Sequence, residues 1–271
     1  MNIRSLLKIG FGMVVLAVLL TGVGAGLLLG TETAPAQVPP PSSDGPVFAM
    51  LIHPKMILLD LVGPMTVFNM TMGKVHLVWK DRTPVSTEVG VPVTPTTTFA
   101  DCPRNVDVFF IPGGLAGSTE LMDDPDTMAF VKDMAANARY VTAVCTGSLV
   151  LGAAGVLKGK RATTLWNVRD LLPTFGAIPV HERVVEDGNI ITGGGTTAGL
   201  DFGLDIVARL KGEDVAKRIQ LIIEYDPHPP FDSGSPEKAD PEIVNRFLKV
   251  RKPAMDDAKA ASLRAAARLR G

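Results

Sequence analysis

Cysteine is scarce in this chain, which has only Cys102 and Cys145 among its 271 residues. Two cysteines cannot build the disulfide framework that stabilises small secreted domains, so an apolar core has to hold the fold. The length suits one large α/β domain once an N-terminal segment is set apart. Cys102 directly precedes Pro103 in an expected loop, and we interpret it as a small buried side chain.

An excess of charge of either sign is also missing. The chain has 27 Lys and Arg against 28 Asp and Glu and shows no dense basic stripe, which predicts that it binds no nucleic acid. The four histidines, His53, His76, His181 and His228, include no pair with metal-ligand spacing, so we interpret all four as structural and predict no metal. Residues 193–195 are glycines without the Gly-Lys-Ser/Thr ending of a phosphate-binding loop. They predict a tight strand-to-helix turn, and no cofactor is expected.

Apolar runs and helical patterns alternate along the chain after residue 46. Residues 106–111 form a near-continuous apolar run that ends in Pro112-Gly113-Gly114, residues 122–137 have the pattern of an amphipathic helix, and residues 140–144 are apolar again. Strands that alternate with helices predict a doubly wound α/β fold, with a mostly parallel sheet and helices on both faces. Ligands of such folds bind at the carboxyl ends of the strands, where Gly113 and Cys145 fall.

Cys145 lies at the junction between the strand of residues 140–144 and a helix that starts at Gly147. A sharp strand-to-helix turn exposes its corner residue in a strained backbone conformation, which is typical of a nucleophile. The helix N-terminus beneath it favours the thiolate, so we expect the pKa of Cys145 to lie below the value of a free thiol. The alternative is a small cysteine that fills core volume. The compact polar residues Thr146-Gly147-Ser148 favour the reactive site.

These residues, together with other segments, resemble the PfpI branch of the class I glutamine-amidotransferase-like superfamily, and within it the isonitrile-hydrating enzymes. The resemblance covers residues 47–271 with similar order and spacing, and it implies a flavodoxin-like fold with Cys145 at a nucleophile elbow. The chain departs from the pattern at Leu165, where a histidine is expected after two threonines. The resembling segments are residues 59–64, 76–80, 99–103, 111–114, 139–164, 179–195, 225–236 and 263–269.

The resemblance implies an enzyme that hydrates an isonitrile to an N-substituted formamide through a thioimidate on Cys145. Asp60 stands at the position of the catalytic aspartate and would handle the proton and position water. Because Asp60 follows three apolar residues, 57–59, we expect burial to raise its pKa. The alternative for Asp60 is an ordinary N-cap of a short helix that starts at Gly63-Pro64.

Three further residues complete the predicted site. Thr146 would supply a hydroxyl and a backbone N–H beside the thiolate, and the N–H groups of Gly113 and Gly114 would stabilise developing negative charge. A protease of this superfamily would carry a histidine directly after the nucleophile, where this chain has Thr146, so proteolysis is not expected. A non-enzymatic ligand-binding or redox-sensing domain remains the alternative, and the resemblance implies a homodimer.

The N-terminal segment predicts a membrane location. Residues 9–30 are uncharged and follow Arg4 and Lys8, a run just long enough to cross a bilayer. Residues 1–30 are therefore interpreted as a transmembrane anchor, or alternatively as a signal peptide cleaved near residue 37. The basic flank leaves the N-terminus in the cytoplasm and places the domain of residues 47–271 on the extracytoplasmic side. Residues 31–46, rich in Pro and Ser, form a linker.

Overall fold

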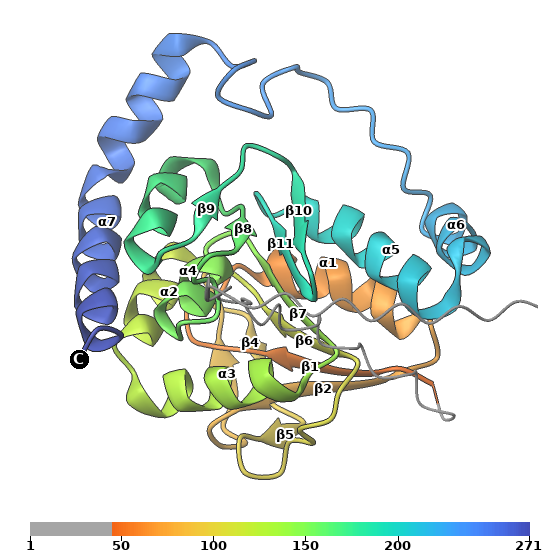
Figure 1. The fold of residues 1–271 in the computed structure, drawn as a ribbon. Helices are drawn as coiled ribbons and strands as arrows, with labels where there is room; N and C mark the ends of the chain where they lie inside the picture. The colour runs from red at the N-terminus through yellow and green to blue at the C-terminus, as the bar shows by residue number, and fades with distance from the viewer. Residues whose placement is uncertain (1–44) are drawn as a thin grey trace, which may run out of the picture. The chain divides into compact units, whose positions relative to one another are not determined.

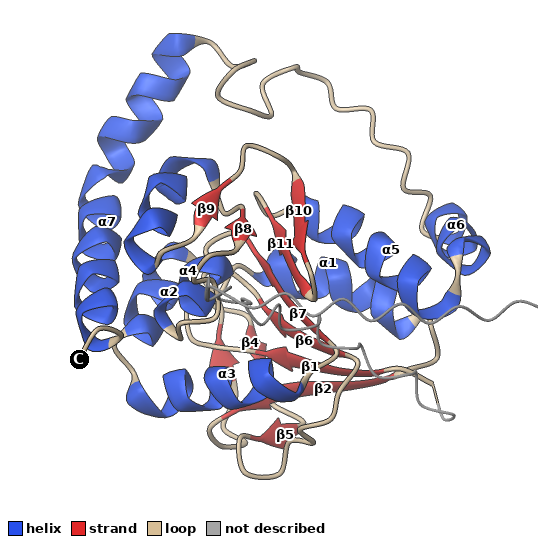
Figure 2. Ribbon diagram, in the orientation of Figure 1, coloured by secondary structure: helices blue, strands red, loops and turns tan. Residues whose placement is uncertain are grey.

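A seven-stranded sheet forms the centre of residues 45–271, the part of the chain that the computed structural model describes (Figure 1, Figure 2). Its strand order is β10-β11-β7-β6-β1-β2-β5, and every neighbouring pair is parallel except β10 with β11. The predicted doubly wound α/β fold is thus confirmed. The strands of this sheet are β1 (Val47–Leu51), β2 (Lys74–Trp79), β5 (Thr97–Thr98), β6 (Val108–Ile111), β7 (Tyr140–Val144), β10 (Val184–Asp187) and β11 (Ile190–Gly193). Two smaller pairs are β3 (Val85–Ser86) with β4 (Pro92–Val93), and β8 (Arg161–Ala162) with β9 (Ile178–Pro179).

Helices cover both faces of the sheet, so each buried strand alternates its side chains between two apolar layers. In β1, Phe48 and Met50 pack with α1, α5 and α6, whereas Ala49 and Leu51 pack with α2, α3, α4, η1 and α7. The helices are α1 (Leu58–Asn69), α2 (Leu115–Met122), α3 (Pro125–Asn137), α4 (Gly147–Ala153), the 3-10 helix η1 (Trp166–Phe175), α5 (Ala198–Lys211), α6 (Glu213–Ile222) and α7 (Pro241–Arg268).

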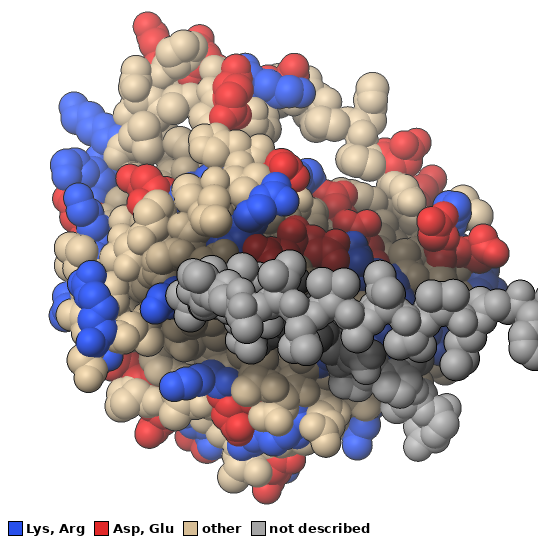
Figure 3. Space-filling view, in the orientation of Figure 1, with Lys and Arg blue, Asp and Glu red and all other residues tan. Residues whose placement is uncertain are grey.

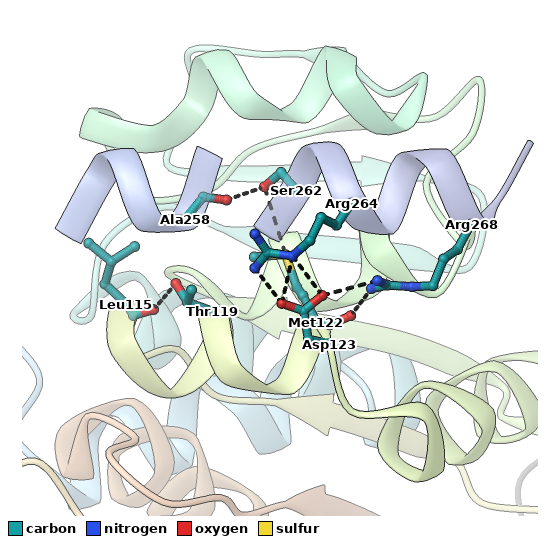
Figure 4. A network of polar contacts seen from close by, with 8 residues as sticks. All are labelled: Leu115, Thr119, Met122, Asp123, Ala258, Ser262, Arg264 and Arg268. Atoms are coloured by element: carbon teal, nitrogen blue, oxygen red, sulfur yellow. Dashed lines mark hydrogen bonds and ion pairs between the residues drawn. The ribbon is translucent and has the colours of Figure 1, made fainter. Parts of the chain in front are cut away.

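A network of hydrogen bonds and ion pairs connects the C-terminal helix α7 to the end of α2 (Figure 4). Arg264 and Arg268 both donate to the Asp123 carboxylate, and Arg268 also donates to the carbonyl of Met122. The hydrogen bonds from Arg264 are the main reason that the pKa of Asp123 lies below its ordinary value. Figure 3 shows Lys and Arg side chains along this edge, while acidic and basic side chains are interspersed over the rest of the visible face.

The predicted anchor, residues 1–30, lies outside the described residues, as does nearly all of the predicted linker, residues 31–46. Within residues 45–271, no helix is long and apolar enough to cross a membrane. The anchor therefore stays a prediction from the sequence.

Helix α1 starts earlier than the sequence predicted. It begins at Leu58, and Pro64 lies inside it rather than in its first turn. Pro64 cannot donate the usual i→i−4 hydrogen bond, but Leu61 and Phe68 are buried, and their packing keeps the helix in place. Asp60 consequently lies in the first turn, and the extended residue Ile57 is the N-cap. The N-cap alternative for Asp60 was wrong.

Two other segments also differ from the prediction. The helix expected over residues 122–137 starts later, at Pro125, because Met122 ends the preceding helix α2 and the Asp124 side chain caps a new one. The sequence also predicts a strand over residues 161–165, but β8 ends at Ala162. Beyond it, Thr163 donates its N–H to the side-chain hydroxyl of Thr192 on β11 instead of to a backbone carbonyl. Side-chain hydrogen bonds of this kind replace ladder hydrogen bonds and end a strand.

Candidate active site

Cys145 occupies the sharp corner between β7 and α4. Its φ of 55° is in the left-handed region, which is unusual for a non-glycine residue. The corner is held by a shared hydrogen bond, since the Cys145 N–H donates to the carbonyls of Gly193 at 3.1 Å and Gly194 at 2.8 Å. The predicted elbow and the predicted turn at residues 193–195 are both confirmed. Cys145 is only 3% exposed, so a substrate has to enter a nearly closed site.

Thr146 lies beside the sulfur as predicted. Its backbone N–H and its hydroxyl both interact with the Cys145 thiol and favour the thiolate. The Thr146 Oγ1 atom also accepts the Gly114 N–H at 2.9 Å and lies 2.9 Å from the Ser118 hydroxyl. These contacts fix the hydroxyl in one position at the start of α4.

Asp60 is fully buried and reaches across from α1 to the same corner. Its Oδ2 atom accepts the Gly113 N–H at 2.9 Å, and the Thr196 hydroxyl and the Cys145 thiol also interact with the carboxyl group. Burial raises the pKa of Asp60 from 3.8 to about 6, although these three hydrogen-bond donors oppose the shift. The predicted rise of the Asp60 pKa is confirmed.

Gly113 lies at the point where the site residues converge. A Cβ atom there would come within 2.6 Å of Cys145 Cβ and Thr146 N and within 2.8 Å of Asp60 Oδ2. Only glycine leaves room for these groups to meet around the end of β6. The next residue, Gly114, has a φ of 132°, a conformation that also favours glycine.

The two glycine N–H groups do not have the predicted oxyanion-binding role. Gly113 N–H donates to Asp60, and Gly114 N–H donates to Thr146, so both donors are engaged within the protein. They position the catalytic side chains instead. The Thr146 N–H beside the sulfur is the backbone donor left to favour negative charge there.

The expected depression of the Cys145 pKa was wrong. Burial raises the pKa of the Cys145 thiol, and the negative charge of Asp60 raises it further, while the Thr146 N–H and hydroxyl oppose the shift less strongly. Near pH 7 the resting site therefore holds a protonated thiol beside a largely ionised Asp60 carboxylate. One proton is available at the pair, and the carboxylate is placed to accept it.

Alkylation of Cys145 should reveal this raised pKa. We expect the rate constant with iodoacetamide to be low at pH 7 and to keep rising beyond pH 9, because the thiolate is the reactive species. The Asp60→Asn variant removes the neighbouring negative charge, so its rate profile should shift to lower pH. A wild-type midpoint below the free thiol value of about 8.5 would contradict the assignment. A Cys102→Ala background restricts the measurement to Cys145.

Four polar residues in the site were not predicted from the sequence as site residues. Thr164 donates its hydroxyl to the Cys145 carbonyl at 2.6 Å, Thr196 contacts Asp60, Ser118 supports Thr146, and the buried His53 ring lies near the carbonyls of Pro54 and Pro112. Three of them follow β1, β8 or β11, so the rule that sites lie beyond strand ends was their only signal. Burial lowers the pKa of His53, which leaves it neutral.

Cys102 lies outside this site and is the small buried side chain that the sequence predicted. It is buried, and burial raises the pKa of its thiol to about 11. Residues 45–271 contain no group of three or more His, Cys, Asp or Glu side chains that could hold a metal ion.

A cavity of about 450 Å³ is lined in part by residues that contact the catalytic pair. Its lining includes Gly194, whose carbonyl accepts the Cys145 N–H, and Thr196, which contacts Asp60. Leu165, the residue that replaces an expected histidine, also lines it, and its side chain lies near Gly195. The substitution thus places an apolar group on the wall of the cavity nearest the site.

Comparisons with known proteins agree with this geometry. A model of the DJ-1/PfpI family matches residues 48–209. The chain is 53% identical over 220 residues to a protein of Pseudomonas putida named isonitrile hydratase, a match that covers 81% of this chain and 96% of the relative. It is 30% identical over 142 residues to the Parkinson disease protein 7 homolog of Danio rerio, covering 51% and 75% of the two chains. A solved structure of a THiJ/PfpI family protein from Pseudomonas syringae matches with a TM-score of 0.79 and 43% identity, over 88% of this chain and 97% of that one.

Proposed function

The chain belongs to the DJ-1/PfpI family, and on this premise we propose that it is a lyase that hydrates an isonitrile to an N-substituted formamide. The observation that carries the proposal is the buried pair of Asp60 and Cys145, which meet around Gly113 with one proton available between them. The 53% identical relative named isonitrile hydratase supports the same reaction.

The first step adds the thiol across the terminal carbon of the isonitrile. Asp60 accepts the S–H proton and passes it to that carbon, while the sulfur attacks the same carbon. The S–H bond breaks, one C–H and one C–S bond form, and the product is a thioimidate on Cys145. Because sulfur attacks as its proton leaves, the step does not need a free thiolate in the resting enzyme.

The second step hydrolyses the thioimidate. Asp60 holds the water, whose oxygen adds to the carbon while a proton goes to the nitrogen. The C–S bond then breaks, the formamide leaves, and the sulfur regains the remaining proton. The Thr146 N–H and hydroxyl stabilise the departing sulfur.

A redox-sensing role fits this site less well than hydration. Sensor cysteines have a low pKa and are open to solvent, whereas Cys145 is 3% exposed and burial raises its thiol pKa. A site that only binds a ligand would also have no need of a buried carboxyl group that is placed to accept the thiol proton.

A panel of small isonitriles tests the proposed reaction. We expect the purified wild-type protein, with Cys145 kept reduced, to release the matching formamide from at least part of the panel. Formamide is detected by its C–H proton resonance as the isonitrile infrared band is lost. Reduced protein that leaves the whole panel unchanged overturns the hydratase function.

We further propose that the chain forms a homodimer, as its family resemblance implies. Large apolar side chains stand exposed on two helices, Leu221 and Ile222 at the end of α6 and Ile243 and Val250 on α7, and a second copy would remove them from water. Sedimentation equilibrium should give twice the chain mass at micromolar concentration. A chain that sediments with the single mass contradicts the proposal.

We also propose that residues 1–30 hold the domain on the extracytoplasmic side of a membrane. The support is the uncharged run of residues 9–30 after Arg4 and Lys8. Membrane fractionation followed by N-terminal sequencing should find an uncleaved membrane form. A soluble form that begins near residue 37 identifies a cleaved signal peptide instead.

A further inference from the structure

Arg169 on η1 has a guanidinium group without a partner. It forms no hydrogen bond or ion pair with any other residue of 45–271, and its Nε atom is buried. A buried donor without an acceptor is destabilising, so a ligand oxygen that accepts from this N–H group would bind favourably. Arg169 lines the cavity beside the catalytic pair.

Two other charged residues of the cavity wall have ion-pair partners just outside it. Arg183 pairs with Asp201 and also donates to the Thr197 hydroxyl at 3.0 Å. Glu182 pairs with Arg161 at 3.6 Å. After these pairs are set aside, Arg169 is the permanent cation of the cavity wall that remains without a hydrogen bond or ion pair within residues 45–271.

Glu237 is a carboxylate on the wall of this cavity that has a weak favourable charge interaction with Arg169. Glu237 lines the same cavity, and its pKa lies below the ordinary value. Its own backbone N–H and the Ser235 hydroxyl are the largest causes, and the charges of Arg169 and His181 add to them. Glu237 forms no ion pair with Arg169 within the described residues, so the donors of the guanidinium stay open to a ligand.

The cavity is placed to receive the side group of the substrate. Gly194 and Thr196 on its wall contact Cys145 and Asp60 directly. The first of these contacts is made by the Cys145 backbone N–H and the second by the Asp60 carboxyl group. A substrate that reaches the sulfur past these two residues would have its other end in this space. At about 450 Å³, the cavity has the size of a small-molecule site.

We propose that Arg169 is a specificity-determining residue that binds a carboxylate on the substrate, so that the preferred substrates are isonitriles carrying a carboxylate group. A guanidinium presents a planar fork of donors that fits a carboxylate with two parallel hydrogen bonds. The proposal rests on the hydratase function, and it adds the chemical class of the side group.

Two matched substrates test the proposal, 4-isocyanobutanoate and its neutral amide. Wild-type protein should favour the carboxylate by about tenfold to a hundredfold in kcat/KM, because a charge-assisted bidentate pair discriminates on that scale. The Arg169→Gln variant should lose this preference through a higher KM for the carboxylate, with kcat retained. Turnover of the neutral amide by this variant should fall far less than turnover of the carboxylate. Arg169→Lys keeps the charge but not the fork, and should recover only part of the preference.

Arg218→Gln is the matched control, since it removes one charge on α6 outside the cavity lining. This variant should keep the wild-type preference, which separates a local contact from the overall field of the protein. Equal kcat/KM for the two substrates in wild type, or a preference that survives Arg169→Gln, overturns the carboxylate pocket and leaves the hydratase intact. Wild type that hydrates neither of these two substrates but hydrates others of the panel also overturns the carboxylate pocket. Wild type that hydrates no isonitrile at all overturns both proposals.

Discussion

Replacement of Cys145 by alanine should reduce formamide release by about 10⁴-fold or more, as expected for loss of a covalent nucleophile. The reaction requires a sulfur atom that gives up a proton and attacks the isonitrile carbon. The Thr146 and Ser118 hydroxyls of the site are hydrogen-bonded to each other and are far harder to deprotonate than a thiol. Time courses of formamide formation, with mass spectrometry for the thioimidate adduct, measure the effect.

Two controls make the Cys145→Ala result specific. Cys102→Ala removes the other cysteine, which lies outside the site, and should leave the rate unchanged. Cys145→Ser keeps the shape of the side chain and should be as inactive as alanine, because the serine hydroxyl has a much higher pKa than a thiol. Formamide release by Cys145→Ala at a rate near wild type contradicts covalent catalysis at this position.

The elbow at Cys145 could be predicted because its determinants are local. An apolar β-branched strand followed at once by small polar residues and a helix is a short-range pattern, and the structure reproduces it. The pKa of the thiol could not be predicted in this way. It depends on complete burial and on the charge of Asp60, which reaches the corner from α1. The Thr146 N–H and hydroxyl at the start of α4 are the local groups that the sequence could indicate. They lower the pKa of the thiol less than burial and Asp60 raise it.

The same contrast between local and long-range determinants explains the other differences between the predicted and the observed structure. Gly113 and Gly114 were correctly placed at the end of β6, but their N–H groups bind Asp60 and Thr146, partners that only the folded chain brings near. The early start of α1 depends on packing, which outweighs the local effect of Pro64. The open guanidinium of Arg169 has no sequence signature, because any arginine in a sequence looks alike until its neighbours are known.

Asp60→Asn should make the protein more stable at pH 7. The pKa of Asp60 is 3.8 in the reference state and about 6 in the folded protein, so the folded state holds this proton more tightly than the unfolded chain does. The stabilisation of the folded state by protonated Asp60 is fully present below pH 3.8, the pKa in the unfolded chain. It is lost as the pH rises through about 6, the pKa in the folded protein. Asparagine is neutral and still accepts the Gly113 N–H, so the variant should gain on the order of 1–3 kcal/mol in free energy of unfolding at pH 7.

Urea unfolding of wild type and variant across the pH range measures this gain. The difference between the two proteins should be largest above pH 7 and should shrink towards zero as the pH falls below about 4. Other carboxyl groups titrate equally in both proteins, so they cancel in the difference. Equal stability at every pH would place Asp60 in a solvated environment and contradict the burial that defines the site.

The same Asp60→Asn substitution should lower kcat/KM by several powers of ten. The amide keeps the size of the carboxyl group and its hydrogen bond from Gly113, but it cannot accept the thiol proton. In wild type, kcat/KM should rise with pH and level off with a midpoint near 6, since the carboxylate is the active form. The variant should lose this midpoint along with the rate. A protein that is more stable but inactive is the result expected of a carboxyl group that folding disfavours and catalysis requires. Retained activity would instead make Asp60 a structural residue and leave the thiol proton without an acceptor.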